Sequence, residues 1–202
     1  MNAPTDLELI QASRDNPSAF AGLFDRHFPA IHRYLNRRYG PEVAEEVASR
    51  TFVVAFEKRA RFRDDCVDAR PWLYGIAGRE VSRHWRSEER RLRAHARLME
   101  DHPADPYEAA ESRADAGALI PAIAAALAQL NRQERDVLLL VAWAELTYQE
   151  TAQALAVPIG TVRSRLSRAR EKVRAALPNH LSLTPKAPGE AIAVPYGGLI
   201  DG

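Results

Sequence analysis

The stretch from Leu146 to Val173 restricts the fold more than any other, because it encodes two short helices joined by a turn. The first helix is predicted to begin at Thr147, since a threonine three residues before Glu150 forms a capping box. Residues 157–160 read Val-Pro-Ile-Gly and interrupt that helix, because proline is tolerated at a helix start but not in its interior. A second helix is therefore expected to begin near Pro158.

The second helix of this stretch has one apolar face and one basic face. Its apolar positions recur at helical spacing and predict a buried stripe. These are Val162, Leu166, Ala169 and Val173. The segment 161–174 holds six Lys and Arg and only one acidic residue. A buried stripe beneath a basic, hydroxyl-bearing face is typical of a recognition helix in a DNA major groove, although a solvated surface helix can share the charge pattern. The outer positions are Thr161, Arg163, Ser164, Arg165, Ser167 and Arg168.

Residues 71–97 predict a long helix, which proline opens at its first position. Four arginines on it recur at positions i, i+4, i+7 and i+11, and Trp72 falls on the same side. Such a stripe can follow a phosphate backbone, and an aromatic ring beside it can stack on unpaired bases. Core packing is favoured for Tyr74 and remains an alternative for Trp72 and Trp85. The arginines are Arg79, Arg83, Arg86 and Arg90.

The overall charge of the 202-residue chain is only +1, but the charges are distributed unevenly. Residues 58–97 hold twelve Lys and Arg against six Asp and Glu, a net charge of +6. Residues 98–120 hold one Arg against six acidic residues, a net charge of −5, and include Pro103 and Pro106. We therefore expect two basic segments joined by a flexible acidic tether.

The N-terminal part of the chain predicts three further helices. The first spans 6–14, the second carries apolar side chains from Phe20 to Leu35, and the third spans 42–59. Pro29 lies inside the second pattern and is predicted to kink or divide that helix.

Residues 147–170, TYQETAQALAVPIGTVRSRLSRAR, resemble the promoter-reading helix-turn-helix of bacterial RNA polymerase sigma factors, in particular the extracytoplasmic-function (ECF) branch. Residues 69–91, with PWLYGIA as the most specific part, resemble the promoter-melting helix of the same family. Two departures fall at helix ends, where Glu145 and Ala156 stand in place of the usual glycine. Glycine adopts the left-handed conformation easily there, and another residue costs about 1 kcal/mol.

The resemblance implies an all-α fold of two small helical domains joined by a flexible acidic linker. The first domain, residues 1–97, is expected to bind core RNA polymerase and to melt the −10 promoter element. The linker spans 98–114, and the second domain, 115–177, carries the helix-turn-helix that reads the −35 element. Residues 178–202 are rich in proline and glycine and are expected to be disordered.

The resemblance also assigns residues to each role. The −35 element is assigned to the outer positions of the recognition helix given above. The −10 element is assigned to a polar loop and to the basic stripe, namely Phe62, Arg63, Asp64, Asp65, Trp72, Arg79, Arg83, Arg86 and Arg90. Core polymerase is assigned to Glu45, Glu46, Ser49, Arg50 and Phe52. Arg50 replaces an acidic residue, and Arg79 an asparagine, that the family commonly has at these positions.

The sequence contains no pattern for catalysis or for a resident metal or cofactor. There is no phosphate-cradling glycine loop and no nucleophile elbow, and the six histidines and one cysteine form no zinc spacing. No run is long and apolar enough to cross a membrane, and a single cysteine fits a reducing cytoplasm. The partners implied by the resemblance are core RNA polymerase (its clamp helices and flap), promoter DNA and an anti-sigma factor.

Two other functions remain alternatives on the sequence alone. A stand-alone transcription regulator could use the same helix-turn-helix, but it would leave the PWLYGIA helix without a role. An enzyme with a DNA-binding tail would need a catalytic constellation between residues 19 and 97, and none is evident.

Overall fold

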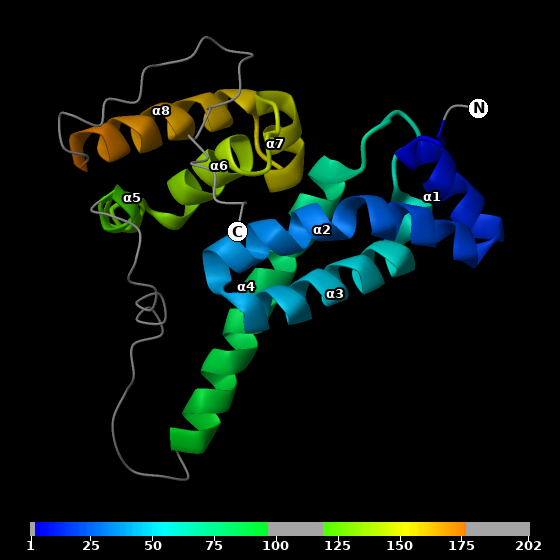
Figure 1. Cartoon of the computed structure of the whole chain (residues 1–202), viewed down its shortest axis with the longest axis horizontal. Coiled ribbons are helices and arrows are strands. Elements are labelled where there is room, and N and C mark those ends of the chain that lie inside the picture. The colour runs from blue at the N-terminus through cyan, green and yellow to red at the C-terminus, as the bar shows by residue number, and fades with distance from the viewer. Residues whose placement is uncertain (1–2, 97–118, 177–202) are drawn as a thin grey trace, which may run out of the picture.

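The computed structural model describes residues 3–96 and 119–176, and every regular element within these ranges is helical (Figure 1). The first unit contains α1 (Asp6–Asp15), α2 (Phe20–Tyr39), α3 (Pro41–Lys58) and α4 (Arg70–Ala96), with 3₁₀ turns at Pro17–Ala19 and Arg59–Arg61. The second unit contains α5 (Leu119–Ala128), α6 (Arg132–Ala142), α7 (Tyr148–Leu155) and α8 (Ile159–Ala176). The all-α fold of two helical units is thus confirmed. The expected linker and the expected disordered tail lie outside the described residues.

Side-chain caps fix the starts of several helices. The predicted capping box opens α7: the hydroxyl of Thr147 accepts from the Glu150 N–H at 3.2 Å, and the Glu150 carboxylate accepts from the Thr147 N–H at 2.7 Å. Boxes of the same type, at Thr5 and Asn131, open α1 and α6. These starts follow from local sequence, because each box needs only residues three positions apart.

The first unit is built on α2 and α3, which lie side by side, with α4 crossing them (Figure 1). Their facing sides bury Leu23, Leu35 and Val47, and α4 adds Leu73 to the same core. Of the two outcomes predicted for Pro29, a kink or a division, the division does not occur, since α2 runs unbroken from Phe20 to Tyr39. Pro29 lies on the exposed side of the helix, so water can hydrate the carbonyl that loses its N–H partner.

The second unit buries the predicted apolar stripe of α8. Val162 and Leu166 pack with Val137 of α6, while Ala169 and Val173 pack beneath α5. Glu145 and Ala156 adopt the left-handed conformation, with φ of 54° and 53°. The helix ends therefore keep the geometry for which glycine is better suited, and the departures from the family pattern change local strain but not the fold.

The two units share one continuous core. Leu139 and Leu146 belong to the same buried cluster as the side chains of α1 to α4. The α7 backbone comes very close to α4 at Gly75, where an added Cβ would lie 2.8 Å from the Ala154 carbonyl oxygen. Polar contacts flank this core: the Arg38 guanidinium donates to Asp136 at 2.5 Å, and Arg70 donates to Glu150 at 3.5 Å. No pattern in the sequence predicted this packing of the second unit against the first.

Candidate nucleic-acid interface

The outer face of α8 is positioned by the helices behind it. Because Val162 and Leu166 are buried, the positions on the opposite side must face solvent. Of the six predicted contact residues, Thr161 and Arg165 are half-buried at the margins of this face. The exposed ones are Arg163, Ser164, Ser167 and Arg168.

One of these exposed residues has an acidic neighbour within the protein. Arg168 Nε lies 4.0 Å from the carboxylate of Glu134, a buried side chain at the start of α6. The Lys172 ammonium donates to the same carboxylate at 2.7 Å, and this hydrogen bond is the main cause that lowers the pKa of Glu134. Glu134 therefore stays ionised, partly neutralises Arg168 and fixes α8 against α6.

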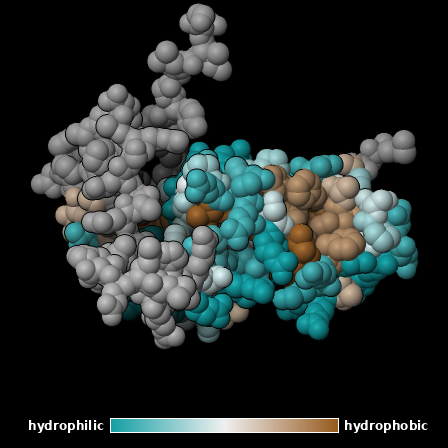
Figure 2. All heavy atoms as spheres, turned by 90° about the horizontal axis from the view of Figure 1, so that it is seen from below, coloured by the Kyte–Doolittle hydropathy of each residue, from teal (hydrophilic) through white to brown (hydrophobic). Residues whose placement is uncertain are grey.

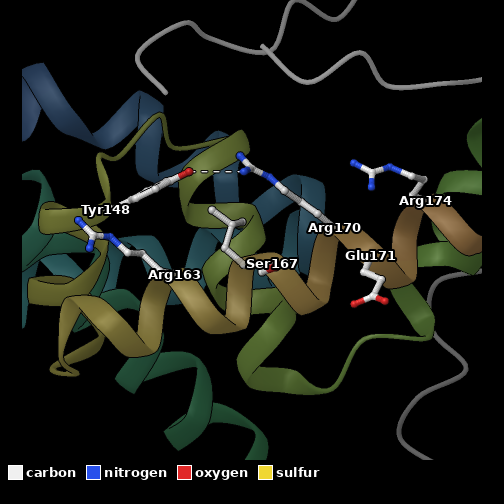
Figure 3. Close-up of a pocket in the computed structure, with 7 residues that line it drawn as sticks. Tyr148, Arg163, Ser167, Arg170, Glu171 and Arg174 are labelled. Atoms are coloured by element: carbon white, nitrogen blue, oxygen red, sulfur yellow. Dashed lines mark hydrogen bonds between the residues drawn. The ribbon is translucent and has the colours of Figure 1, made fainter. Parts of the chain in front are cut away.

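A shallow hollow lies between α7 and α8 (Figure 3). Figure 3 shows Tyr148 of α7 reaching across to α8, where its hydroxyl accepts from Arg170 at 3.4 Å. Sequence reasoning placed Arg170 close to the predicted DNA-binding face but predicted no DNA contact for Tyr148, Arg170 or Arg174. The missed signal is spacing: Arg163, Ser167, Arg170 and Arg174 recur at i, i+4, i+7 and i+11, as the arginines of α4 do. The hollow is lined by Tyr148, Arg163, Leu166, Ser167, Arg170, Glu171 and Arg174.

The predicted arginine stripe of α4 lies on an exposed face. Arg79, Arg83, Arg86 and Arg90 are all exposed, and Glu80 lies beside the stripe, 3.9 Å from Arg83. Tyr74 is buried against Tyr34, as predicted, with ring centroids 5.2 Å apart. The environments of Trp72 and Trp85 differ.

Trp72 is half-buried and packs edge-on against Phe62, with ring centroids 5.1 Å apart. Trp85 is 37% exposed on the outer part of α4. A ring that stacks on an unpaired base needs a free face, so Trp85 is the better placed of the two in this structure.

The loop of residues 62–69 joins the 3₁₀ turn after α3 to α4. Phe62, which was assigned to DNA, is 5% exposed, so its ring supports the loop from inside. Arg63 and Asp65 form an ion pair with each other on the surface. Asp64 is exposed and accepts from Arg14 of α1 at 3.2 Å. The predicted loop residues Arg63, Asp64 and Asp65 are thus exposed on one loop, whereas the ring of Phe62 packs beneath it.

Another cluster of predicted residues lies on the outer face of α3. Glu45, Glu46, Ser49 and Arg50 are exposed there, whereas Phe52 is 4% exposed and packs inward. The exposed apolar residues beside this row are Val53, 46% exposed, and Phe24 of α2, 37% exposed. Figure 2 shows apolar side chains gathered on the side of the molecule where α3 lies. Val53 continues the exposed row four residues after Ser49, a spacing visible in the sequence.

Comparisons with known proteins place both basic helices in one family. Sigma-70 region 2 matches residues 23–91, and Sigma-70 region 4 matches residues 121–173. The chain is 31% identical over 166 residues to the ECF RNA polymerase sigma factor SigC of Mycobacterium tuberculosis, an alignment that covers 82% of this chain and 87% of SigC. This chain belongs to the ECF sigma factors of the sigma-70 family.

Solved structures agree with this assignment. This sigma factor is similar to CnrH, solved in complex with the cytosolic domain of CnrY, with a TM-score of 0.60 and 26% identity over 84% of this chain and 95% of that one. It also shares its fold with the sigma factor RpoE of Bartonella quintana, solved with the anti-sigma factor NepR, at a TM-score of 0.58 and 21% identity over 78% of this chain and 95% of that one. As a sigma factor, the chain directs promoter-specific transcription.

The two family matches divide the sigma factor along its helices. Region 2 begins within α2 and ends within α4, and region 4 extends from α5 into α8. The helix α1 (Asp6–Asp15) lies outside both matches, although it packs directly on α2 and on the turn before the loop.

Other kinds of site find no support in the part of the sigma factor that the structure describes. Among residues 3–96 and 119–176, no group of His, Cys, Asp and Glu is arranged to hold a metal ion. In the same ranges, no helix has the length and apolar character needed to span a membrane. Burial, and after it the Asp65 carboxylate, raise the pKa of the Cys66 thiol, which disfavours the reactive thiolate.

Proposed function

We propose that this ECF sigma factor reads the −35 element with α8 and opens the −10 element with α4 and the loop 62–69, while core RNA polymerase holds it in place. The observation that carries this proposal is a pair of exposed basic rows with the same spacing, one on each unit. They lie on helices that belong to regions 2 and 4. A row of arginines at i, i+4, i+7 and i+11 can follow a phosphate backbone for about three helical turns.

On α8, the proposal separates residues that read bases from those that hold phosphates. Arg163, Ser164 and Ser167 are exposed near the start of the helix, the part that enters the major groove in helix-turn-helix proteins. Arg170 and Arg174 lie further along the row and are assigned to phosphates. Arg168 is assigned a weaker contact because Glu134 already attracts it, and the half-buried Thr161 and Arg165 border the contact.

On the first unit, the row from Arg79 to Arg90 follows the strands as they separate. The exposed face of Trp85, on the outer part of α4, is available to stack on an unpaired base, and at the other end of the helix the loop presents Arg63, Asp64 and Asp65 to solvent. The exposed acidic and apolar row of α3 is assigned to core polymerase.

We propose further that the sigma factor itself catalyses nothing, requires no cofactor and works in the cytoplasm with the polymerase. An anti-sigma factor is proposed as a further partner, supported by the solved complex of the related RpoE with NepR.

The test is transcription in run-off assays with core polymerase and promoters altered separately at the −35 and −10 elements. The Arg163→Ala variant should lower transcript yield at least about fivefold, because it removes a charged groove contact worth about 1–3 kcal/mol. Its affinity for core polymerase should not change. Arg37→Ala, an exposed arginine of α2 outside the proposed surfaces, serves as the matched control.

A gel shift with and without core polymerase separates the proposal from a stand-alone regulator. Promoter binding should require core polymerase. Tight and specific binding of the isolated chain, together with no association with core polymerase, would favour the regulator and refute the proposal.

A further inference from the structure

The helix α1 lies outside both sigma matches, yet it anchors the loop 62–69 at both of its ends. At the start of the loop, the Arg14 guanidinium donates to the Phe62 carbonyl at 3.4 Å and to Asp64 at 3.2 Å. At the end of the loop, the Asp6 carboxylate accepts from the Ala69 N–H at 2.9 Å. One helix of ten residues thus connects two points that are separated by most of the loop.

The Asp6 carboxylate is built into the interior. Asp6 is only 6% exposed, and three hydrogen-bond donors surround its carboxylate. Arg26 donates to Oδ1 at 2.6 Å, His27 Nε2 lies 2.7 Å from Oδ2, and the Ala69 N–H donates to the same Oδ2. A buried carboxylate needs such partners, because an unpaired one is strongly unfavourable. The position of Ala69 is therefore set by a rigid group with directed hydrogen bonds.

This contact also lies at the start of α4 and holds the residue that precedes the helix. The Ala69 carbonyl accepts the first helical hydrogen bond, from Leu73 at 2.9 Å, so Ala69 occupies the N-cap position. Alanine has no side chain that could cap a helix, and two carboxylates hold this end instead: Asp68 accepts from the Arg70 N–H at 2.8 Å, and Asp6 holds the Ala69 N–H from another helix. A negative charge at this end is also favourable to the helix dipole. Successive side chains of a helix project at fixed angles about its axis. The position of the first turn of α4 therefore sets the direction in which Trp72 and the arginine row project.

Between its two anchors the loop is open to solvent. Arg63 and Asp65 are exposed, and Val67 is 65% exposed, the most exposed large apolar side chain among the described residues. The loop therefore combines fixed ends with a free middle, which is the arrangement expected of a segment that must hold a flexible strand in one orientation.

We propose that Asp6 is a positioning residue for promoter opening: from α1 it fixes the end of the loop 62–69 and the first turn of α4, without touching DNA. Arg14 positions the start of the loop in the same way, through its hydrogen bonds to Phe62 and Asp64. This inference rests on the proposed function, because it assumes that the loop and α4 engage the −10 element. It adds α1, which neither family match includes, to the parts that determine how that element is read.

The experiment compares Asp6→Asn with Asp25→Asn, which makes the same charge change at an exposed position of α2. The first readout is backbone hydrogen exchange of residues 62–73 in the free sigma factor, which does not depend on any promoter. Asp6→Asn should exchange at least about tenfold faster at the Ala69 amide, because the hydrogen bond to the carboxylate is weakened. The control should exchange like the unaltered protein.

The second readout is the opening of a −10 element by the complex with core polymerase. Opening is measured by the permanganate reactivity of unpaired thymines. Each position of the element is tested with all four bases. Asp6→Asn should open the preferred element at least about tenfold more slowly and should discriminate less between bases, with core affinity and −35 dependence unchanged. A role in stability alone would lower the yield of active complex without altering base preference.

Faster exchange combined with unchanged opening and unchanged base preference would overturn the positioning role, and unchanged exchange at Ala69 would overturn the anchoring itself. If the unaltered sigma factor opened no promoter with core polymerase, the proposed function would fail, while the exchange measurement would still test the anchor. Should Asp6→Asn fail to fold, Arg14→Ala provides the test, because it frees the start of the loop and leaves the buried Asp6 carboxylate with all its partners. It should loosen residues 62–64 and slow opening; normal opening with a loosened loop would contradict the proposal.

Discussion

At the scale of single residues, Ala156 is a point of backbone strain. It ends α7 in the left-handed conformation, at φ 53° and ψ 47°, where a side chain is unfavourable. Ala156→Gly should raise the free energy of unfolding by roughly 0.5 to 1 kcal/mol, because relief of strain exceeds the added entropy of the unfolded chain. Urea unfolding followed by circular dichroism measures the change. Gln153→Gly, at an exposed interior position of α7, should lower stability instead; a loss at both positions would contradict the account.

A second residue-scale prediction concerns acid stability. Burial would raise the pKa of Asp6, but hydrogen bonds from His27 and the Ala69 N–H outweigh it and lower this pKa from 3.8 to about 2. Because the folded pKa lies below the unfolded one, the ionised group stabilises the fold above pH 3.8, and this contribution is lost as the pH falls toward 2. Asp6→Asn should therefore cost about 2 kcal/mol at pH 7 and progressively less below pH 4. Urea unfolding of both proteins across this pH range tests the prediction. If the stability difference between Asp6→Asn and the unaltered protein did not depend on pH, the lowered pKa of Asp6 would be contradicted.

At the scale of elements, the basic side chains of α8 differ in function. Arg170 lies on the row that we propose to face DNA, whereas Lys172 is paired with the buried Glu134 at 2.7 Å. Arg170→Ala should weaken promoter binding by the polymerase complex and reduce the slope of log affinity against log salt by about one. Lys172→Ala should lower stability but leave that slope unchanged. Equal slopes for both variants in fluorescence titrations would show that Arg170 makes no phosphate contact.

At the scale of the whole molecule, Gly75 controls the contact between the two units. A Cβ at this position would lie 2.8 Å from a backbone oxygen of α7, whereas one at Gly78 would meet nothing within 4 Å. Gly75→Ala should therefore separate the units and increase the radius of gyration measured by small-angle X-ray scattering. Gly78→Ala should leave that radius unchanged and, by its higher helix propensity, add up to about 1 kcal/mol of stability. Identical scattering from both variants would mean that the units do not close in this way in solution.

Residues whose role depends on local periodicity were predictable. The buried stripe of α8, the exposed arginines of α4 and the buried Tyr74 all follow from helical spacing within a single element. Phe52 and Phe62 illustrate what depends on other helices. Both were assigned to binding surfaces by resemblance, but the structure buries both, because partners from other helices cover them. Val53 and Phe24 occupy the exposed apolar positions on that side instead.

The sequence by itself determined the helices, their caps and the two basic rows, because capping boxes, proline and helical periodicity act over a few neighbouring residues. Only the tertiary structure decided that Asp6 would meet Ala69, that Arg38 would meet Asp136, and that α7 would lie on α4 at Gly75. These contacts join residues that are distant along the chain. No local pattern encodes them, because packing of whole helices brings the partners together.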